Sequence, residues 1–375
     1  VQGIGGDTAL LVAIILAVFT ILFGTRRLDG RERHQGMMTA IAVESVVKLV
    51  AFVAVAVLAV SYLSDLPAAP AQQATPDAGG VVLSSEFLAR TFISALAILC
   101  LPRQFHVMVV EAQEDTDTRI ARWLFPIYLA LFMLLVVPIS SAGARLFAGA
   151  DISPDVYVQQ LPIALDSNWV TVAAFIGGIS AATGMVIVAT VSLAIMVTNE
   201  VIAPLVMRWN ADSPAAVLKL GDSLRRIRQY AIAGILLAAW LVTHRLMEIP
   251  WLAQIGFISF LAAAQLAPAL LAGLYWRRAH GLAVTIGLLA GLVLWFYSGV
   301  LPAVLAADSA LLVAGPLGID WLRPMNLLGV AGEYRLAYAT AWSLGVNTTL
   351  LVLLSLVLKP SQADIRQARL FTGEE

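Results

Sequence analysis

The sequence predicts an all-α membrane protein with about nine transmembrane helices. Hydrophobic residues make up 60% of the 375-residue chain and charged residues 13%, whereas soluble domains contain about 45–50% and about 25%. Nine apolar segments have about the length that a helix needs to cross a hydrocarbon core of about 30 Å. They cover residues 7–24, 37–63, 86–102, 120–141, 169–198, 229–246, 251–275, 281–301 and 336–358.

Polar connections separate these segments. Arginines stand between the first and second spans, and the Pro-, Ala- and Gly-rich residues 64–80 predict a flexible outer loop before the third. Residues 153–168 and 308–333 are longer connections that can hold short interfacial helices. Residues 214–228 place apolar side chains near helical spacing beside a basic face. This pattern fits either a helix lying on the inner leaflet or a solvated loop helix.

The positive charges indicate the orientation of the spans, because short connections rich in Lys and Arg stay on the cytoplasmic side. Most of the 23 Lys and Arg residues fall in every second connection. We therefore expect Val1 outside and Glu375 in the cytoplasm, with the lipid bilayer as a partner. The basic connections contain Arg26, Arg27, Arg31, Arg33, Arg103, Arg119, Arg122, Arg208, Lys219, Arg225, Arg226, Arg228, Arg277, Arg278, Lys359, Arg366 and Arg369.

Several classes of function are excluded by composition. The net charge of −1 argues against nucleic acid as a partner, since phosphate binding needs a basic excess. The single cysteine, Cys100, permits no intrachain disulfide, and four scattered histidines make a zinc cluster unexpected. The motifs G-x-S-x-G, H-E-x-x-H and the P-loop do not occur. We expect no enzyme activity, no catalytic residues and no organic cofactor in this chain.

Ionisable residues inside a span are candidates for function, because their burial in lipid is unfavourable. Glu44 and Lys48 stand at i and i+4 in the second span, so their side chains share a face and can form an ion pair. Two interpretations stay open. The pair acts in substrate binding or gating, or it lies near the cytoplasmic end, where Lys48 reaches the interface.

Two prolines predict interruptions of the helical spans. In Leu99 to Glu111, Pro102 is followed by Gln104 and His106. A broken helix at membrane depth indicates a binding site or gate, but Pro102 could instead simply end the third span. In the seventh span, Gln265 and Pro268 interrupt an apolar face. We take Pro102, Gln104, His106 and Gln265 as candidates for a substrate site or gate.

The fifth span is rich in small residues between Phe175 and Glu200. Small residues let helices approach closely, and the hydroxyls of Ser and Thr can form hydrogen bonds or coordinate an ion. Helix packing and ion binding both explain such a composition.

The order of these segments resembles that of a known family. QLAPALLAGLYWRRAHGLAVTIGLLAG, residues 265–291, resembles a run late in the solute:sodium symporter family, and LCLPRQFHVMVVEA looks like a signature at the start of its second repeat. A closer similarity, over almost the whole chain, is to the symporter-like N-terminal transmembrane domain of bacterial sensor histidine kinases. It rests on FGTRRLDGRERHQGMMTAIAVESVVKLVAF, LPRQFHVMVVE, GMVIVATVSLAIMVTNEVIAPLVMR and LKPSQADIRQARLF.

This resemblance implies a LeuT-type inverted-repeat helical bundle, in which two five-helix repeats enclose the solute and ion sites. Against the family pattern of thirteen spans, the nine here would be the last nine, so we expect an N-terminal truncation. Residues 1–360 would form the symporter-like transmembrane domain, lacking the first spans. Residues 361–375 would form a cytoplasmic linker to a missing C-terminal module.

The family's sodium site transfers poorly to this chain. That site uses a small residue and a Ser-Thr pair on the helix that matches the fifth span. An ungapped match places the small residue at Ala181 and the pair at Gly184 and Met185, and a one-residue shift brings in Thr183. These four residues are the ion-binding candidates. Gly184 and Met185 offer no hydroxyl as a sodium ligand, which favours a proton as the coupling ion or a sensor domain that does not transport. Sodium stays open as the coupling ion, because the one-residue shift supplies the hydroxyl of Thr183.

The resemblance implies a sensor domain in the bacterial inner membrane. It would bind a small solute, plausibly an amino acid, and pass its occupancy to fused cytoplasmic kinase domains that act on a response regulator. The alternative is a free-standing secondary transporter coupled to sodium or protons. A membrane-embedded enzyme is a third class, for which only Glu44 and Lys48 offer intramembrane chemistry. The reading frame beyond Glu375 discriminates the first two.

Overall fold

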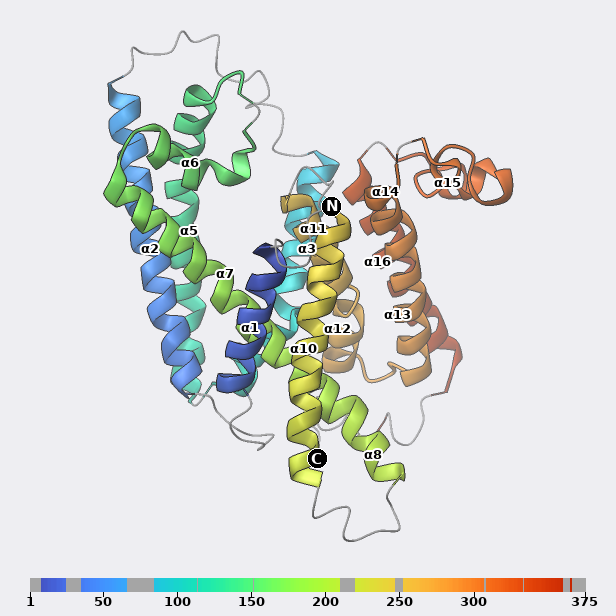
Figure 1. Ribbon diagram of the computed structural model, residues 1–375. Helices are drawn as coiled ribbons and strands as arrows, with labels where there is room; N and C mark the ends of the chain where they lie inside the picture. Colours follow the sequence, from blue (N-terminus) through green and yellow to red (C-terminus); the bar gives the residue numbers. More distant parts are fainter. Residues whose placement is uncertain are drawn as a thin grey trace. The chain divides into compact units, whose positions relative to one another are not determined.

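In the computed structural model, every described regular element is a helix (Figure 1). The structure describes residues 8–24, 35–65, 84–112, 114–150, 152–209, 220–246, 252–306, 308–332, 334–359 and 365. Most of the expected outer loop 64–80 and of the expected linker 361–375 lies outside these ranges. The chain divides into two compact units, 1–69 with 105–248 and 70–104 with 249–375. Each unit is described separately below.

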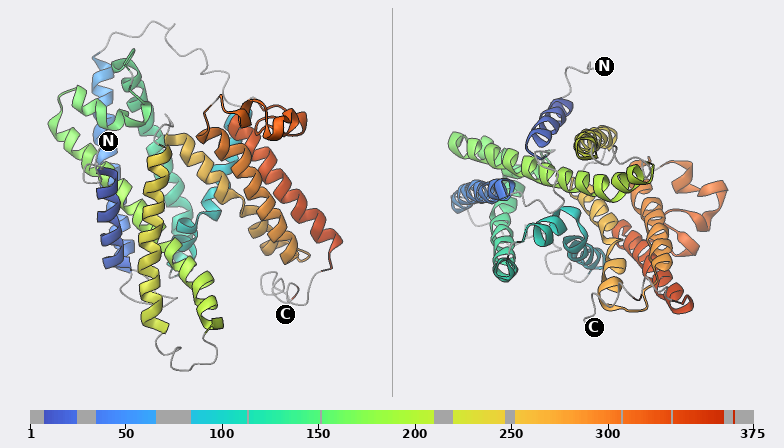
Figure 2. Two further views of the ribbon diagram at one scale, coloured as in Figure 1. Left: turned by 45° about the vertical axis from the view of Figure 1, so that its right-hand side comes forward. Right: turned by 90° about the horizontal axis from the view of Figure 1, so that it is seen from below.

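The first unit is built around α7, which packs against α1, α2, α6 and α10. Figure 2 shows α1 and α10 on one side of α7 and α2 on the other. The helix α5 packs against α2 and α6. The elements are α1 (Thr8–Gly24), α2 (Gln35–Ser64), η4 (His106–Val110), α5 (Asp115–Leu146), η5 (Pro154–Val156), α6 (Tyr157–Ala164), α7 (Asn168–Met196), η6 (Val197–Ile202), α8 (Ala203–Trp209) and α10 (Leu220–Leu246).

Local sequence signals explain where several helices begin. The helix α5 starts with a capping box, in which the side chains of Glu114 and Asp117 each accept a hydrogen bond from the backbone of the other. The helix α3 (Ser85–Cys100) of the second unit starts after Ser84, whose hydroxyl accepts the N–H of Phe87 at 3.2 Å. These caps satisfy backbone donors that have no partner within the helix.

The core of the first unit joins the ends of several helices. Val55, Ala59, Ile139 and Leu161 are buried together. The surrounding apolar side chains come from the C-terminal ends of α2 and α5, from α6 and from the start of α7. Because the C-terminal ends of α2 and α5 meet in one cluster, the two helices run parallel, as the predicted topology requires of the second and fourth spans.

The second unit is built around α16, which packs against α3, α11, α12 and α13. Its N-terminal end contacts the start of α3, since the Ala337 N–H donates to Glu86. Its C-terminal end meets the start of α13, where the Ser355 hydroxyl accepts the His280 N–H at 3.1 Å. The elements are α3 (Ser85–Cys100), α11 (Leu252–Ala264), α12 (Ala267–Tyr275), α13 (Gly281–Trp295), η7 (Phe296–Val300), α14 (Leu301–Val304), α15 (Ala310–Val313), η8 (Pro316–Gly318), η9 (Asp320–Leu322), η10 (Leu327–Gly329) and α16 (Arg335–Val357). A four-residue helix, α4 (Pro102–Phe105), crosses the boundary between the units.

The helices confirm a multi-pass membrane protein. Among the described residues, six helices are long and apolar enough to cross a membrane, or seven if the bent pair of α3 and Pro102–Val109 counts as one span. The first predicted span is a shorter apolar helix, Ala9–Leu22, and the sixth lies in α10. All nine predicted segments are thus largely helical, but nine membrane crossings remain a prediction.

The outer surfaces of these helices are apolar. On α5, Trp123, Met133 and Leu134 are exposed, each over more than half of its surface. Contiguous apolar surface of this kind aggregates in water and suits contact with lipid chains.

The long connections contain the expected short helices. Residues 153–168 hold η5 and α6, and residues 308–332 hold α15 and three short 3-10 turns. The stretch 214–228 differs from both sequence interpretations over its described part. Residues 220–228 are the first turns of α10, which continues as one helix to Leu246 and includes the sixth predicted span.

Candidate functional site

The ion pair predicted in the second span forms in the structure. Lys48 Nζ lies 2.6 Å from Glu44 Oε1, and the two side chains are 17% and 14% exposed. Tyr128 of α5 donates its hydroxyl to the backbone carbonyl of Ser45 at 3.2 Å, next to Glu44. The pair therefore lies largely buried within the first unit, where mutual attraction offsets part of the desolvation of each charge.

The Glu44 carboxylate lies directly against α7 at Gly184. A Cβ atom at position 184 would overlap the carboxylate. Two turns earlier, a Cβ on Gly177 would lie 2.5 Å from the Cβ of Ala51. Glycines thus bring α7 close to the face of α2 that carries the ion pair, as small residues do at membrane helix interfaces.

Two groups of sequence candidates therefore converge. Gly184, predicted as an ion-binding position, and Glu44, predicted as a substrate or gate residue, are neighbours in one site. The Thr183 hydroxyl donates a hydrogen bond to the Ile179 carbonyl at 2.9 Å, one turn earlier in the same helix. Ala181 is half-buried and Met185 is 50% exposed. Ion binding at these positions stays a prediction.

The helix break predicted at Pro102 is present. The helix α3 ends at Cys100, Leu101 has extended backbone, and a helix resumes at Pro102. The two segments are bent by 47°. Pro102 occupies the first position of the new helix, where its missing N–H removes no hydrogen bond. A span broken at Pro102 and a span that ends there both fit this geometry, so the two interpretations stay predictions. Gln104 lies in this short helix and is half-buried.

His106 lies after the break and is buried beside a carboxylate. Its Nε2 atom lies 3.3 Å from Glu111 Oε1, and the two side chains are 9% and 2% exposed. Both residues belong to a single π-helical turn, closed by the Glu111 N–H donating to the His106 carbonyl at 3.1 Å. The imidazole is charged only when it is protonated, and in that form it pairs with the Glu111 carboxylate. Sequence inspection selected His106 but missed Glu111, which stands five residues later.

Gln265 marks an interruption of the helix within a single candidate span of the second unit, Gln254–Tyr275. The helix α11 ends at Ala264 and α12 begins at Ala267, so Gln265 and Leu266 form a turn between them. Gln265 is fully buried. Pro268 stands at the second position of α12, where a proline again removes no helix hydrogen bond.

A network of side-chain amides and a hydroxyl holds this break. Asn347 Nδ2 donates to the Gln265 backbone carbonyl at 2.8 Å and to its side-chain oxygen at 3.1 Å. Gln265 Nε2 donates in turn to the Ser343 hydroxyl at 2.9 Å. A Cβ on Gly291 of α13 would overlap the Gln265 side-chain oxygen. The network satisfies the backbone that the break exposes, as burial requires.

Sequence inspection missed the partners of Gln265. Asn347 and Ser343 lie at i and i+4 on the ninth span, so they share one helix face, and this spacing was the available signal. Gly287 and Gly291, four residues apart on the eighth span, make room for Asn347.

A cavity of about 550 Å³ lies beside the break, within the second unit. Ala267 and Pro268 line it on α12, directly after the turn, and Thr340, Leu344 and Gly345 line it on α16. Its lining is almost entirely apolar. The cavity can therefore accept a small molecule with an apolar part.

Comparisons with known proteins identify no relative. No family model matches the chain, and neither the curated proteins nor the solved structures contain a match.

Proposed function

We propose that the chain is the symporter-like transmembrane domain of a bacterial sensor histidine kinase. It would adopt the LeuT-type inverted-repeat fold in the inner membrane, with Val1 outside and Glu375 in the cytoplasm. It would bind a small solute, with an amino acid as the candidate by family analogy, and pass the occupancy of the site to fused kinase domains and a response regulator. A solute could do this only through different affinities for two conformations of the domain.

The observation that carries this proposal is the break between α11 and α12 at Gln265. Discontinuous helices at membrane depth are the usual architecture of solute sites in secondary transporters, because they offer backbone groups to the ligand. Here the break is buried, held by Asn347 and followed directly by the cavity at Ala267 and Pro268. We place the solute in this cavity, with its polar group toward the turn.

The ion pair on α2 supports a coupled mechanism. If the coupling ion is a proton, Glu44 is the group in that site that could accept it, since its carboxylate is held against Gly184. Protonation would remove its attraction to Lys48 and change the contact between α2 and α7. Sodium coupling would instead need oxygen ligands near Ala181 and Thr183.

The proposal is tested by filling the cavity. Gly345 lines it, and a Cβ added there meets no atom within 4 Å. Gly345→Leu should therefore fold normally while occupying the solute space. The matched control is Gly273→Leu on α12, whose added Cβ also meets no atom within 4 Å but which does not line the cavity.

The measurement is the thermal stability of the full chain in lipid nanodiscs against a panel of L-amino acids, in sodium or potassium buffer. A ligand that binds only the folded state raises the melting temperature. We expect at least one amino acid to stabilise the wild type and Gly273→Leu but not Gly345→Leu. A panel without any stabilising compound, or equal stabilisation of Gly345→Leu, would contradict the proposal.

A further inference from the structure

A second cavity, of about 250 Å³, lies within the second unit, at the N-terminal ends of α3 and α16. Glu86 and Arg90 of α3 line it, together with Gln254 and Phe257 of α11 and Arg335 of α16. The helix ends around it lie on the predicted outer side of the membrane. None of these residues belongs to the site at Gln265 or to the cavity at Pro268.

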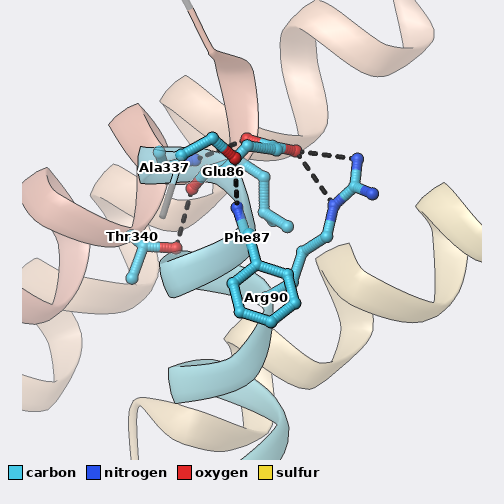
Figure 3. Close-up of polar contacts among 7 residues, drawn as sticks. Glu86, Phe87, Arg90, Ala337 and Thr340 are labelled. Atoms are coloured by element: carbon cyan, nitrogen blue, oxygen red, sulfur yellow. Dashed lines mark hydrogen bonds and ion pairs between the residues drawn. The ribbon is translucent and has the colours of Figure 1, made fainter. Parts of the chain in front are cut away.

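The single carboxylate of this cavity is already engaged (Figure 3). Glu86 Oε1 accepts hydrogen bonds from Arg90 Nε at 3.2 Å and from Arg90 Nη2 at 3.1 Å. Glu86 Oε2 accepts the backbone N–H of Ala337, in the first turn of α16, at 3.3 Å. Glu86 therefore balances the charge of Arg90 and contacts the positive end of α16.

The charge of Arg335 remains unbalanced within the cavity. The lining contains one acidic side chain and two basic ones. Within the described part of the chain, the Arg335 guanidinium has no hydrogen-bond or ion-pair partner, and the residue is exposed. The cavity consequently carries a net charge of about +1 and offers the donors of a guanidinium to an incoming anion.

The walls beside this charge are apolar. Phe257, Ile258, Leu261 and Leu336 line the cavity, and Arg90 lies over the Phe257 ring with its guanidinium carbon 5.4 Å from the centroid. The volume suits a small compound rather than a peptide or a lipid chain. A bound anion would therefore contact Arg335 with its charged end and these walls with its apolar body.

We infer that this cavity binds a small monocarboxylate with an aromatic or branched aliphatic body. The carboxylate would accept hydrogen bonds from Arg335, and Gln254 would offer an amide donor at the cavity wall. This site is independent of the proposed function, because a carboxylate can bind here whether or not a solute binds at the break near Gln265.

The test uses the full chain in lipid nanodiscs and isothermal titration calorimetry. Benzoate and isovalerate are the probes, and benzamide is the uncharged match for benzoate. We expect saturable binding of at least one carboxylate and binding of benzamide at least about tenfold weaker, since a charge-assisted hydrogen bond contributes about that factor. Arg335→Gln should weaken carboxylate binding by a similar factor.

Two variants serve as controls. Arg145→Gln removes an exposed arginine of α5 on the same predicted side of the membrane, and should leave carboxylate binding unchanged. Gly345→Leu fills the other cavity and should also leave it unchanged, which separates this inference from the proposed function. Arg335 is exposed, so its substitution should not disturb folding, and elution on gel filtration checks this. Equal affinity for benzoate and benzamide, unaltered affinity in Arg335→Gln, or no saturable carboxylate binding at millimolar concentration would overturn the inference.

Discussion

The Glu44 carboxylate on α2 occupies the space that a side chain at position 184 of α7 would fill. The ion pair with Lys48 is therefore fitted to a glycine on the neighbouring helix rather than held by α2 alone. A change at either helix is transmitted to the other, because the carboxylate has no free space on the α7 side.

The glycines of α7 should differ in their effect on stability. Gly177→Ala places a methyl group 2.5 Å from the Cβ of Ala51, which cannot rotate away, so the helices must separate. We expect a loss of about 1–3 kcal/mol in unfolding free energy, measured by denaturant titration in detergent. Gly184→Ala meets only the flexible end of Glu44, so it should cost less stability while displacing the carboxylate.

The control for both substitutions is Gly234→Ala on α10. An added Cβ there meets no atom within 4 Å, so helix propensity alone should raise stability by about 0.5–1 kcal/mol. A Gly177→Ala protein as stable as Gly234→Ala would show that the close approach of α2 and α7 is absent.

The ion pair should show strong coupling between its members. Glu44→Gln leaves the Lys48 charge largely buried without its partner, and we expect a loss of roughly 2–3 kcal/mol in unfolding free energy. Lys48→Met should cause a similar loss, because it leaves the Glu44 charge largely buried without its partner. The double variant Glu44→Gln/Lys48→Met removes both charges and should be more stable than either single variant. In this double-mutant cycle, a loss of unfolding free energy in the double variant equal to the sum of the two single losses would mean that the two side chains do not interact.

The amide network should depend on Asn347. Asn347→Leu keeps the side-chain size but leaves the Gln265 backbone carbonyl and side-chain oxygen without these donors. We expect a loss of about 1–3 kcal/mol in unfolding free energy. The matched control is Thr349→Val, which changes an exposed residue of α16 and should stay within about 0.5 kcal/mol of the wild type. Equal stabilities of the two variants would show that the network does not hold the break.

The sequence predicted the helical segments well because a membrane imposes a single length and polarity on them. The break at Pro102 and the ion pair of Glu44 with Lys48 were also predictable, since proline chemistry and i, i+4 spacing act locally. The contact between Glu44 and Gly184 was not predictable, although both residues were selected, because it depends on which helix packs against α2. Asn347 was missed for the same reason: its role depends on Gln265, 82 residues earlier in the chain.

The most direct test of the account is the sidedness of single cysteines, introduced into a Cys100→Ala background and labelled in intact cells with a membrane-impermeant maleimide. Asp65→Cys, Ala150→Cys and Asp308→Cys lie at helix ends predicted to face outward, and Glu114→Cys and Ala279→Cys at ends predicted to face the cytoplasm. We predict that the first three are labelled and that the last two are labelled only after permeabilisation. Labelling of Glu114→Cys and Ala279→Cys on opposite sides of the membrane would contradict the alternating topology.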